Sequence, residues 1–375
     1  MKAAAARTAR LARRQLIAAV QRRRDVAALR RQVPRPRVPL GVADRGGVSH
    51  GPHIGVVTVA PWHDSLGDVA TERATIDHLG GRGVPTRQVL PSASPAGPGP
   101  SPAALVVGGG DLLTCPSDPV WRSALDRYCI PGRHLLNAVG LDPDRVLDRD
   151  RYAHLADYRL LSCRDEPGAE FIAEVTGRDV SLVPCPATLV APAEFAVLGQ
   201  LPGYEEVGRL RPGGFAVVHR HPAMEVAVAA LRSQMPVVTV DMQRWRRYPL
   251  IGEDVALPSH DPCVAMALVA EAAVVVTISL HLAIFAIGSG TPLAVLDQGD
   301  PQGKKVKRYL ERAGAGVVVT HDRRELFGVA DAHAALVKDV GAAERERARA
   351  HLAAIVSASR EALGEAEGAG HGGAP

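Results

Sequence analysis

Short runs of β-branched and aliphatic residues recur along the chain, each followed by a polar or glycine-rich turn and then by an apolar helical pattern. These runs occupy 54–60, 103–107, 215–218, 274–278 and 293–296. Short apolar runs without alternation are typical of parallel strands that helices cover on both faces. The alternation of strand and helix in two halves predicts an α/β fold with two Rossmann-like domains facing a cleft.

Changes in composition along the chain predict its domain organisation. A basic helical extension with a Pro-rich linker is followed by an N-terminal Rossmann-like domain, a linker, a C-terminal Rossmann-like domain, and a C-terminal helix with a disordered tail. The predicted boundaries of these five parts are 1–40, 41–190, 191–212, 213–335 and 336–375. We expect the charged helix at 342–363 to cross back and brace the two domains, and the glycine-rich residues after it to be disordered.

The net charge of +4 conceals an uneven distribution of charge. Residues 1–38 contain 12 Lys or Arg and one acid, so of the 44 basic and 40 acidic residues the remainder keeps 32 and 39. The predicted basic helix at 1–33 could lie on an anionic membrane surface as an in-plane anchor, or it could be a solvated helix. We expect no nucleic-acid binding, because the acidic body offers no continuing basic surface.

The cysteine pattern and the hydropathy both bear on localisation. The five cysteines are widely spaced and include no Cys-x-x-Cys, and the chain shows no secretory signal and no apolar run of membrane-spanning length. We therefore expect a reduced, cytoplasmic protein, which residues 1–33 could hold at the inner face of the membrane.

The region after the fourth apolar run contains the main candidate site. Ser279-Leu280-His281 follows this strand at its carboxyl end, where open α/β sheets bind their ligands. After the next strand, a basic helix begins with Lys304 and Lys305. Lysines and the free N–H groups of a helix start both attract phosphate, so this arrangement favours an anionic substrate.

Arg220 is a second candidate for anion binding, because it follows the strand at 215–218. Its planar guanidinium suits bidentate contact with phosphate or carboxylate. His219 and His221 flank it, and alternate residues of an extended chain share one face, so this pair could instead bind a metal. No third ligand stands at recognisable spacing, and we therefore expect no metal site.

Several segments, taken in chain order, resemble the polysaccharide pyruvyl transferase family. The matching motifs are Ser65-Leu66-Gly67-Asp68, Gly108-Gly109-Gly110-Asp111-Leu112, Arg164-Asp165, Leu280-His281, Ile284-Phe285-Ala286, Gly290-Thr291-Pro292 and Asp300-Pro301 with Lys304 or Lys305. The family's fold is similar to that of GT-B glycosyltransferases. Two positions depart from its pattern: Ser279 stands where the family normally has arginine, and Cys185 where it has aspartate.

The resemblance implies a reaction. The enolpyruvyl carbons of phosphoenolpyruvate would be transferred to two hydroxyls of a sugar or lipid-linked glycan, giving a cyclic pyruvate ketal and free phosphate without a further cofactor. We expect His281 to act as general acid and Asp68 to orient the acceptor. Arg220, Lys304 and Lys305 are expected to form the anion clamp.

The remaining candidates have structural alternatives. Gly108, Gly109 and Gly110 would permit close approach by a substrate or by the facing domain. Arg164 could bind substrate or pair with Asp165 in its own loop. Ser279 belongs to the predicted substrate site by position, and Asp68 could simply cap its helix.

Three functions therefore stay open. The first is a pyruvyl transferase with an altered donor site, acting on a cell-surface glycan or its precursor. The second is a GT-B-like glycosyltransferase or other group transferase with a different donor, which the missing arginine at Ser279 would permit. The third is a non-catalytic homologue that acts as a binding partner.

Overall fold

The computed structural model describes most of the chain beyond residue 50, and these residues all belong to one compact unit, 50–375. The described ranges are 51–58, 65–89, 102–110, 132–140, 149–201, 204–210, 214–243, 248, 250–257, 261–299 and 301–371. The predicted basic helix at 1–33 and its linker lie outside the described residues, as do Asp111, Leu112 and Asp300.

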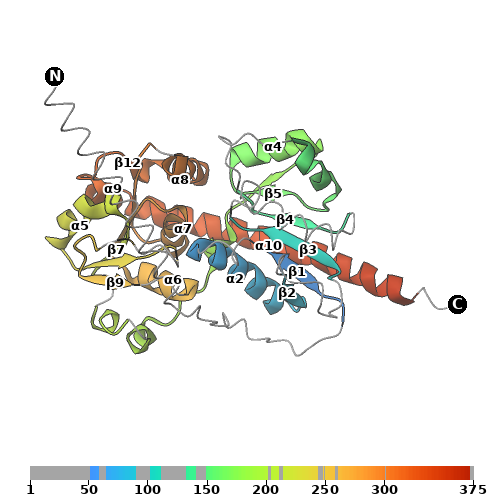
Figure 1. The fold of residues 1–375 in the computed structure, drawn as a ribbon, viewed down its shortest axis with the longest axis horizontal. Coiled ribbons are helices and arrows are strands. Elements are labelled where there is room, and N and C mark those ends of the chain that lie inside the picture. Colours follow the sequence, from blue (N-terminus) through green and yellow to red (C-terminus); the bar gives the residue numbers. More distant parts are fainter. Residues whose placement is uncertain are drawn as a thin grey trace, which may run out of the picture. The chain divides into compact units, whose positions relative to one another are not determined.

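A four-stranded parallel sheet forms the first half of the described chain (Figure 1). Its strands are β1 (Ile54–Val57), β2 (Thr86–Gln88), β3 (Ala104–Gly108) and β4 (Leu135–Asn137), in the spatial order β2-β1-β3-β4. A short parallel pair, β5 (Ser162–Cys163) and β6 (Ser181–Leu182), follows β4 in the chain.

Helices cover both faces of this sheet, because successive strand residues point to opposite sides. One face packs Leu105 and Val107 against the 3₁₀ segment η2 (Arg149–Asp157) and α4 (Glu166–Thr176). The other face packs Ile54, Val56, Ala104 and Val106 against α2 (Leu66–Gly81) and α10 (Ala334–His371). The absence of alternation in the apolar runs thus reflects burial on two sides.

A six-stranded parallel sheet forms the second half, in the spatial order β12-β11-β10-β7-β8-β9. Its strands are β7 (Ala216–His219), β8 (Val237–Val240), β9 (Val255–Leu257), β10 (Val274–Thr277), β11 (Leu293–Leu296) and β12 (Val319–Thr320). Helices α6 (Pro262–Glu271), α7 (Leu280–Ser289) and α8 (Pro301–Ala313) cover one face, and α5 (Glu225–Arg232) and α9 (Leu326–Ala332) cover the other. Short 3₁₀ segments join these elements: η3 (Pro186–Leu189), η4 (Phe195–Gln200), η5 (Val207–Arg209), η6 (Pro222–Met224) and η7 (Gly316–Val318).

Two helices pack against elements of both halves. Leu66 and Ala70 of α2 share a core with α6 and α7, whereas Leu79 at the other end of α2 packs on the four-stranded sheet. Helix α10, drawn in red in Figure 1, packs against α7 through its first part and against β3 and β4 through Leu352 and Ile355. Bracing by a C-terminal helix was expected from the sequence, and α10 has these contacts.

The fold class is confirmed: the protein is α/β with parallel sheets. The predicted domain boundaries and the cleft remain predictions. One correction concerns the C-terminal tail, because α10 continues through His371 rather than ending at Leu363. Glu365 in this extension pairs with Arg133 and Arg159, which ties the last turns to the body. Among the described residues, no helix is both long and apolar enough to cross a membrane.

Candidate functional site

The site begins at the point in the six-stranded sheet where strand order reverses. The chain starts this sheet in the middle with β7, adds β8 and β9 on one side, and then adds β10, β11 and β12 on the other. The switch lies between β7 and β10, which pair directly. Open α/β sheets bind ligands beyond the carboxyl ends of the strands at such a switch. His219 ends β7 there and Arg220 follows it, and Ser279 and His281 follow β10.

The first turn of α2 packs against this edge. The backbone N–H of Leu66 donates to the carbonyl of Met242, 2.9 Å away, and Ser65 forms an antiparallel bridge with Gln243. A Cβ on Gly67 would overlap the imidazole of His281, so only glycine leaves room for the ring. The glycine of the Ser-Leu-Gly-Asp motif is therefore explained by contact with His281.

Arg164 reaches the same imidazole from another segment. It follows β5 and is only 1% exposed, and its Nη1 lies 3.4 Å from Nε2 of His281. A guanidinium has donors only, so Nε2 must accept this hydrogen bond and the proton of the neutral ring must lie on Nδ1. Burial opposes the charge of Arg164, but Cys185, Asp165 and Asp68 more than offset it, and the pKa of Arg164 is raised.

His281 is a neutral imidazole in this environment. Burial first, and the positive charge of Arg164 second, lower its pKa to about 3. His281 lies in the first turn of α7, which begins at Leu280. The predicted role as general acid stays a prediction, and it requires a bound group that raises this pKa.

Asp68 and Lys305 complete the cluster. Asp68 is 5% exposed inside the first turn of α2, whose N-cap is Ser65, so Asp68 is not the N-cap residue that the sequence allowed. Its negative charge favours the charged forms of both Arg164 and Lys305. Burial is the larger effect on Lys305 and lowers its pKa to about 8. Lys304, its neighbour in α8, is exposed.

Cys185 lies behind Arg164, where the family pattern has aspartate. Its side chain is fully buried and hydrogen-bonds the Arg164 guanidinium. Its Sγ also lies 3.4 Å from the hydroxyl of Thr71 in α2. The guanidinium thus meets a thiol where the family pattern has a carboxylate.

Arg220 has a different environment from the one predicted. Its Nη1 lies 3.4 Å from a carboxylate oxygen of Asp241, and its Nε lies 3.2 Å from one of Glu253. Both carboxylates are buried, and Thr239 donates to Glu253 at 3.0 Å. Two carboxylates facing one guanidinium disfavour a further anion, so the geometry argues against Arg220 as part of the clamp.

The Gly108-Gly109-Gly110 segment contacts the protein itself. A Cβ on Gly108 would overlap the carbonyl oxygen of Asn137, and one on Gly109 would lie 2.7 Å from Cγ2 of Thr71. Gly109 and Gly110 also have positive φ angles of 87° and 70°. These contacts account for Gly108 and Gly109 by packing of β4 and α2, and their substrate-binding role remains a prediction.

Ser279 and Asp165 have local structural partners. Ser279 is the N-cap residue of α7, makes no side-chain cap hydrogen bond, and donates its N–H to Thr277 Oγ1 at 2.8 Å. Asp165 caps α4 by accepting from the N–H of Gly168 at 3.0 Å. Arg164 is therefore placed by a capped loop while its side chain extends toward His281.

The two histidines beside Arg220 give no support for a metal site. Their rings stack with centroids 5.8 Å apart, and burial lowers the pKa of His219 to about 3. His221 accepts a hydrogen bond from the N–H of Ala223. Within the described ranges, no three metal-binding side chains come together.

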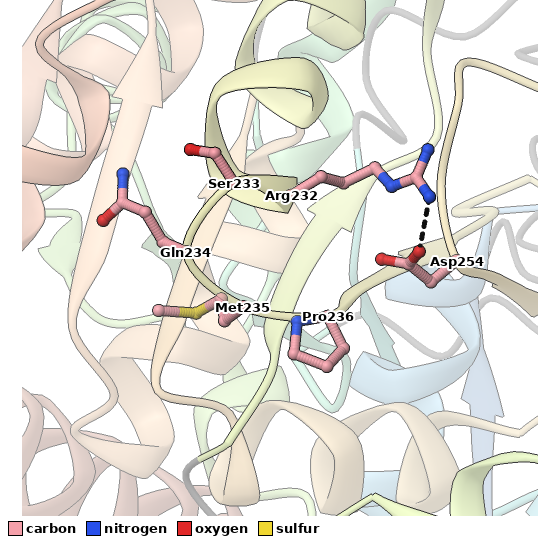
Figure 2. Close-up of a pocket in the computed structure, with 6 residues that line it drawn as sticks. All are labelled: Arg232, Ser233, Gln234, Met235, Pro236 and Asp254. Atoms are coloured by element: carbon pink, nitrogen blue, oxygen red, sulfur yellow. Dashed lines mark ion pairs between the residues drawn. The ribbon is translucent and has the colours of Figure 1, made fainter.

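A surface hollow lies elsewhere on the same sheet. Figure 2 shows its lining by Arg232, Ser233, Gln234, Met235, Pro236 and Asp254. These residues precede β8 and β9, so they belong to the amino edge, whereas His281 and Arg220 follow the carboxyl ends. Arg232 and Asp254 pair at 2.8 Å across the hollow, which is therefore separate from the cluster.

The structure thus brings together Asp68, Arg164, His281 and Lys305, with Ser279 beside them in sequence. Sequence reasoning missed the carboxylate partners of Arg220, which lie 21 and more residues away in the chain. It also treated Lys304 and Lys305 alike. The sequence did contain a signal that separates the two lysines. Lys305 stands one helical turn before Tyr309, so it lies near the buried face of α8.

Comparison with solved structures finds distant similarity in shape. Against UDP-GlcNAc 2-epimerase from Methanocaldococcus jannaschii the identity is 11% and the TM-score 0.43, covering 75% of this chain and 92% of that one. Against the glycosyltransferase SnogD from Streptomyces nogalater the identity is 12% and the TM-score 0.40, covering 82% and 99%. A search of curated protein sequences gives no match.

Comparison with family sequence patterns gives a match that includes most of the site. The pattern described as polysaccharide pyruvyl transferase matches residues 66–300, from the first residue of α2 to the residue before α8. Asp68, Arg164 and His281 lie within the match, and Lys305 follows it by five positions. By this match over more than half of its length, the chain belongs to the polysaccharide pyruvyl transferase family.

Proposed function

We propose that the protein transfers the pyruvyl group of phosphoenolpyruvate to two hydroxyls of a sugar in a cell-surface glycan or its lipid-linked precursor. C2 of the donor gains bonds to both sugar oxygens and loses its bond to the phosphate oxygen, while the methylene C3 gains a proton and becomes a methyl group. Of the two hydroxyl protons released, one balances the proton gained by C3 and the other leaves with phosphate.

The observation that carries this proposal is the contact of Arg164 with His281, which follows the switch-point strand β10, together with the electrostatic reach of Asp68 to both Arg164 and Lys305. The donor has a phosphate and a carboxylate, and both require positive charge in a partly desolvated site. Arg164 and Lys305 supply it in our proposal. Of the clamp expected from sequence, Lys305 is kept, and Arg164 takes the place of Arg220 and Lys304.

His281 is proposed to deliver the proton to C3. Its resting pKa of about 3 is set by burial and by Arg164. A bound dianionic donor would offset the charge of Arg164 and raise this pKa, so the donor would help to protonate its own catalyst. Under this coupling, His281 would be protonated only while the donor is bound.

Asp68 is proposed to have two roles, one before and one after the donor binds. In the free protein its charge stabilises Arg164 and Lys305. Once the donor supplies its own negative charge to these cations, the carboxylate can accept a hydrogen bond from the sugar hydroxyl that attacks C2. The acceptor therefore approaches from the side of α2.

The test is phosphate release from phosphoenolpyruvate in the presence of candidate sugar acceptors, with the ketal methyl group detected by ¹³C NMR from labelled donor. We expect His281→Ala to abolish both signals, and Lys304→Ala to leave them within about twofold of the wild type. Undiminished turnover by His281→Ala would remove this residue from the mechanism.

A different donor is the second candidate, and the observation that favours it is Ser279 at the position where the family normally has arginine. A nucleotide sugar that raises the melting temperature, where phosphoenolpyruvate leaves it unchanged, would support this alternative. If neither compound has an effect and a protein partner co-purifies, the result would favour a non-catalytic homologue.

A further inference from the structure

A chain of buried polar side chains connects the C-terminal helix to the candidate site. Its members are His351 of α10, Asn137 at the end of β4, Ser162 of β5, and Thr75 and Thr71 of α2. Each is no more than 8% exposed. Buried polar groups persist only when they are hydrogen-bonded, and networks of them are costly to leave half satisfied. We call this set the relay.

The direction of each hydrogen bond near His351 follows from counting protons. The hydroxyl of Ser162 donates to the carbonyl of Leu136 at 2.7 Å and accepts from the N–H of Ala138 at 2.9 Å. Its single proton is therefore used, so Nε2 of His351, 3.2 Å away, must donate to it. The same Nε2–H points to Oδ1 of Asn137 at 3.0 Å.

The relay continues through Asn137 into α2. The Asn137 amide donates to Thr75 Oγ1 at 3.1 Å, and that hydroxyl donates to the carbonyl of Thr71 at 2.8 Å. If the Asn137 amide were flipped, its oxygen would face Thr75 Oγ1. Neither atom could then donate a hydrogen bond, because the Thr75 hydroxyl already donates its proton to the carbonyl of Thr71. This orientation is therefore the one that satisfies every member.

The relay ends on both sides of His281. Thr71 Oγ1 donates to the carbonyl of Gly67 at 3.1 Å, and Gly67 is the residue packed on the His281 ring. The Cys185 thiol, 3.4 Å from Thr71 Oγ1, donates to it and accepts from Arg164. On the other branch, Ser162 lies two residues before Arg164.

We propose that His351 is a positioning residue: through the relay it holds Gly67 and Arg164 in place around the imidazole of His281. The inference rests on the proposed function for its effect on turnover, but its effect on geometry stands by itself. His351 touches none of the reacting groups. The link from α10 to the site passes through neutral hydrogen bonds as far as α2 and β5, and then through the backbone of Thr71 on one branch and of residues 162–164 on the other. Small displacements transmitted to a site in this way can reduce rates tenfold to a hundredfold or so.

The experiment compares variants of His351 with a variant of the same helix. His351→Leu removes the donor, His351→Gln keeps an N–H of similar reach, and Ile355→Ala removes packing one turn further along α10 without touching the relay. Nitrogen-15 imidazole NMR of the full chain reports the tautomer and environment of His281, with the exposed His321 as internal reference.

We expect the free protein to show the Nδ1–H tautomer for His281 and the Nε2–H tautomer for His351. His351→Leu should shift the His281 signals and lower turnover about tenfold, His351→Gln should restore both, and Ile355→Ala should change only the melting temperature. Unchanged His281 signals in His351→Leu, or equal shifts in Ile355→Ala, would overturn the proposal.

A second variant guards against failure of His351→Leu to fold. Thr75→Val keeps the side-chain volume and breaks the relay between Asn137 and Thr71, so it should produce the same displacement of the His281 signals. A Thr75→Val spectrum identical to that of the wild type would contradict the relay. If wild-type protein shows no turnover with phosphoenolpyruvate, the proposed function fails while the NMR comparison still decides this inference.

Discussion

At the carboxyl edge of the four-stranded sheet, Asn137 and Gly108 meet neutral partners and close packing, whereas the same edge of the six-stranded sheet carries Arg220 and His281 with buried charge around them. Both edges have a change of strand order, and sequence reasoning gave both a role in substrate binding. The difference teaches that a strand end becomes a candidate site when its side chains leave charge to be satisfied. Glycines alone show only that something packs closely there.

The largest expected effect separates the two buried arginines. Arg164→Gln should lower turnover about a thousandfold, because it removes a preorganised cation from the proposed donor site. Arg220→Gln should lower turnover less than about tenfold but cost about 3 kcal/mol of unfolding free energy, because it leaves Asp241 and Glu253 buried without their counterion. Phosphate-release assays and denaturant unfolding measure the two effects. The opposite ranking would move the site to Arg220.

Two glycines test whether the carboxyl edge of the four-stranded sheet serves packing while that of the six-stranded sheet serves activity. Gly108→Ala should destabilise the fold by about 3 kcal/mol, because its Cβ would overlap the Asn137 backbone. Gly67→Ala instead meets the movable ring of His281, so we expect a smaller loss of stability with loss of turnover. Unfolding curves and assays at a temperature well below both midpoints distinguish them. Equal destabilisation with equal residual activity would remove the distinction.

The two lysines of α8 form a matched pair at adjacent positions. Lys305→Ala should weaken turnover about thirtyfold, because its ammonium lies within the electrostatic reach of Asp68 in a desolvated setting. Lys304→Ala, on the exposed side, should change it less than about twofold. A larger effect for Lys304 would indicate that the donor binds on the outer face of α8.

The smallest expected effect is a shift of one titration. In the free protein His281 should stay neutral down to about pH 4, because its pKa is about 3, and that of His351 is lowered to about 4 by burial. Saturating inorganic phosphate should raise the pKa of His281 by about one unit or more and leave that of His351 unchanged. NMR titration with and without phosphate measures both. A shift at His351 alone would contradict the placement of the anion.

The lowered pKa values of His281 and His351 also determine in which direction stability changes with pH. Their ordinary pKa is 6.5 and the folded values are lower, so the unfolded chain binds more protons below about pH 6.5. The contribution of these two histidines to the free energy of unfolding is therefore fully present above about pH 6.5, and it is lost as the pH falls toward their folded pKa values. Urea unfolding at several pH values follows this loss.

Much of the fold could be predicted from sequence because burial on both faces leaves an uninterrupted signal. The strands at 274–278 and 293–296 were predicted within one residue of β10 and β11, since β-branched runs bounded by turn residues have few alternatives. The length of α10 was underestimated, because glycines after Leu363 signal disorder while the ion pairs of Glu365 depend on tertiary contacts.

The site was harder to predict than the fold because the charge state of each side chain depends on which other side chains lie beside it. His281 could be found from its position after a strand, but its lowered pKa comes from burial and from Arg164, which is 117 residues away in the chain. Arg220 looked equally suitable until its carboxylate partners were known. Position along one strand predicts where a side chain lies, whereas its charge state depends on neighbours that only folding supplies.

The relay has a consequence for how the protein is made. Asn137 leaves the ribosome 214 residues before His351, its buried partner. Until that helix arrives, a nascent chain holds the carbonyl oxygen of the Asn137 side chain without its final donor and the strands β3 and β4 without the part of their cover that α10 supplies. The sheet that is synthesised first thus gains its full cover only when the C-terminal helix arrives, and until then its uncovered apolar surface is prone to aggregation.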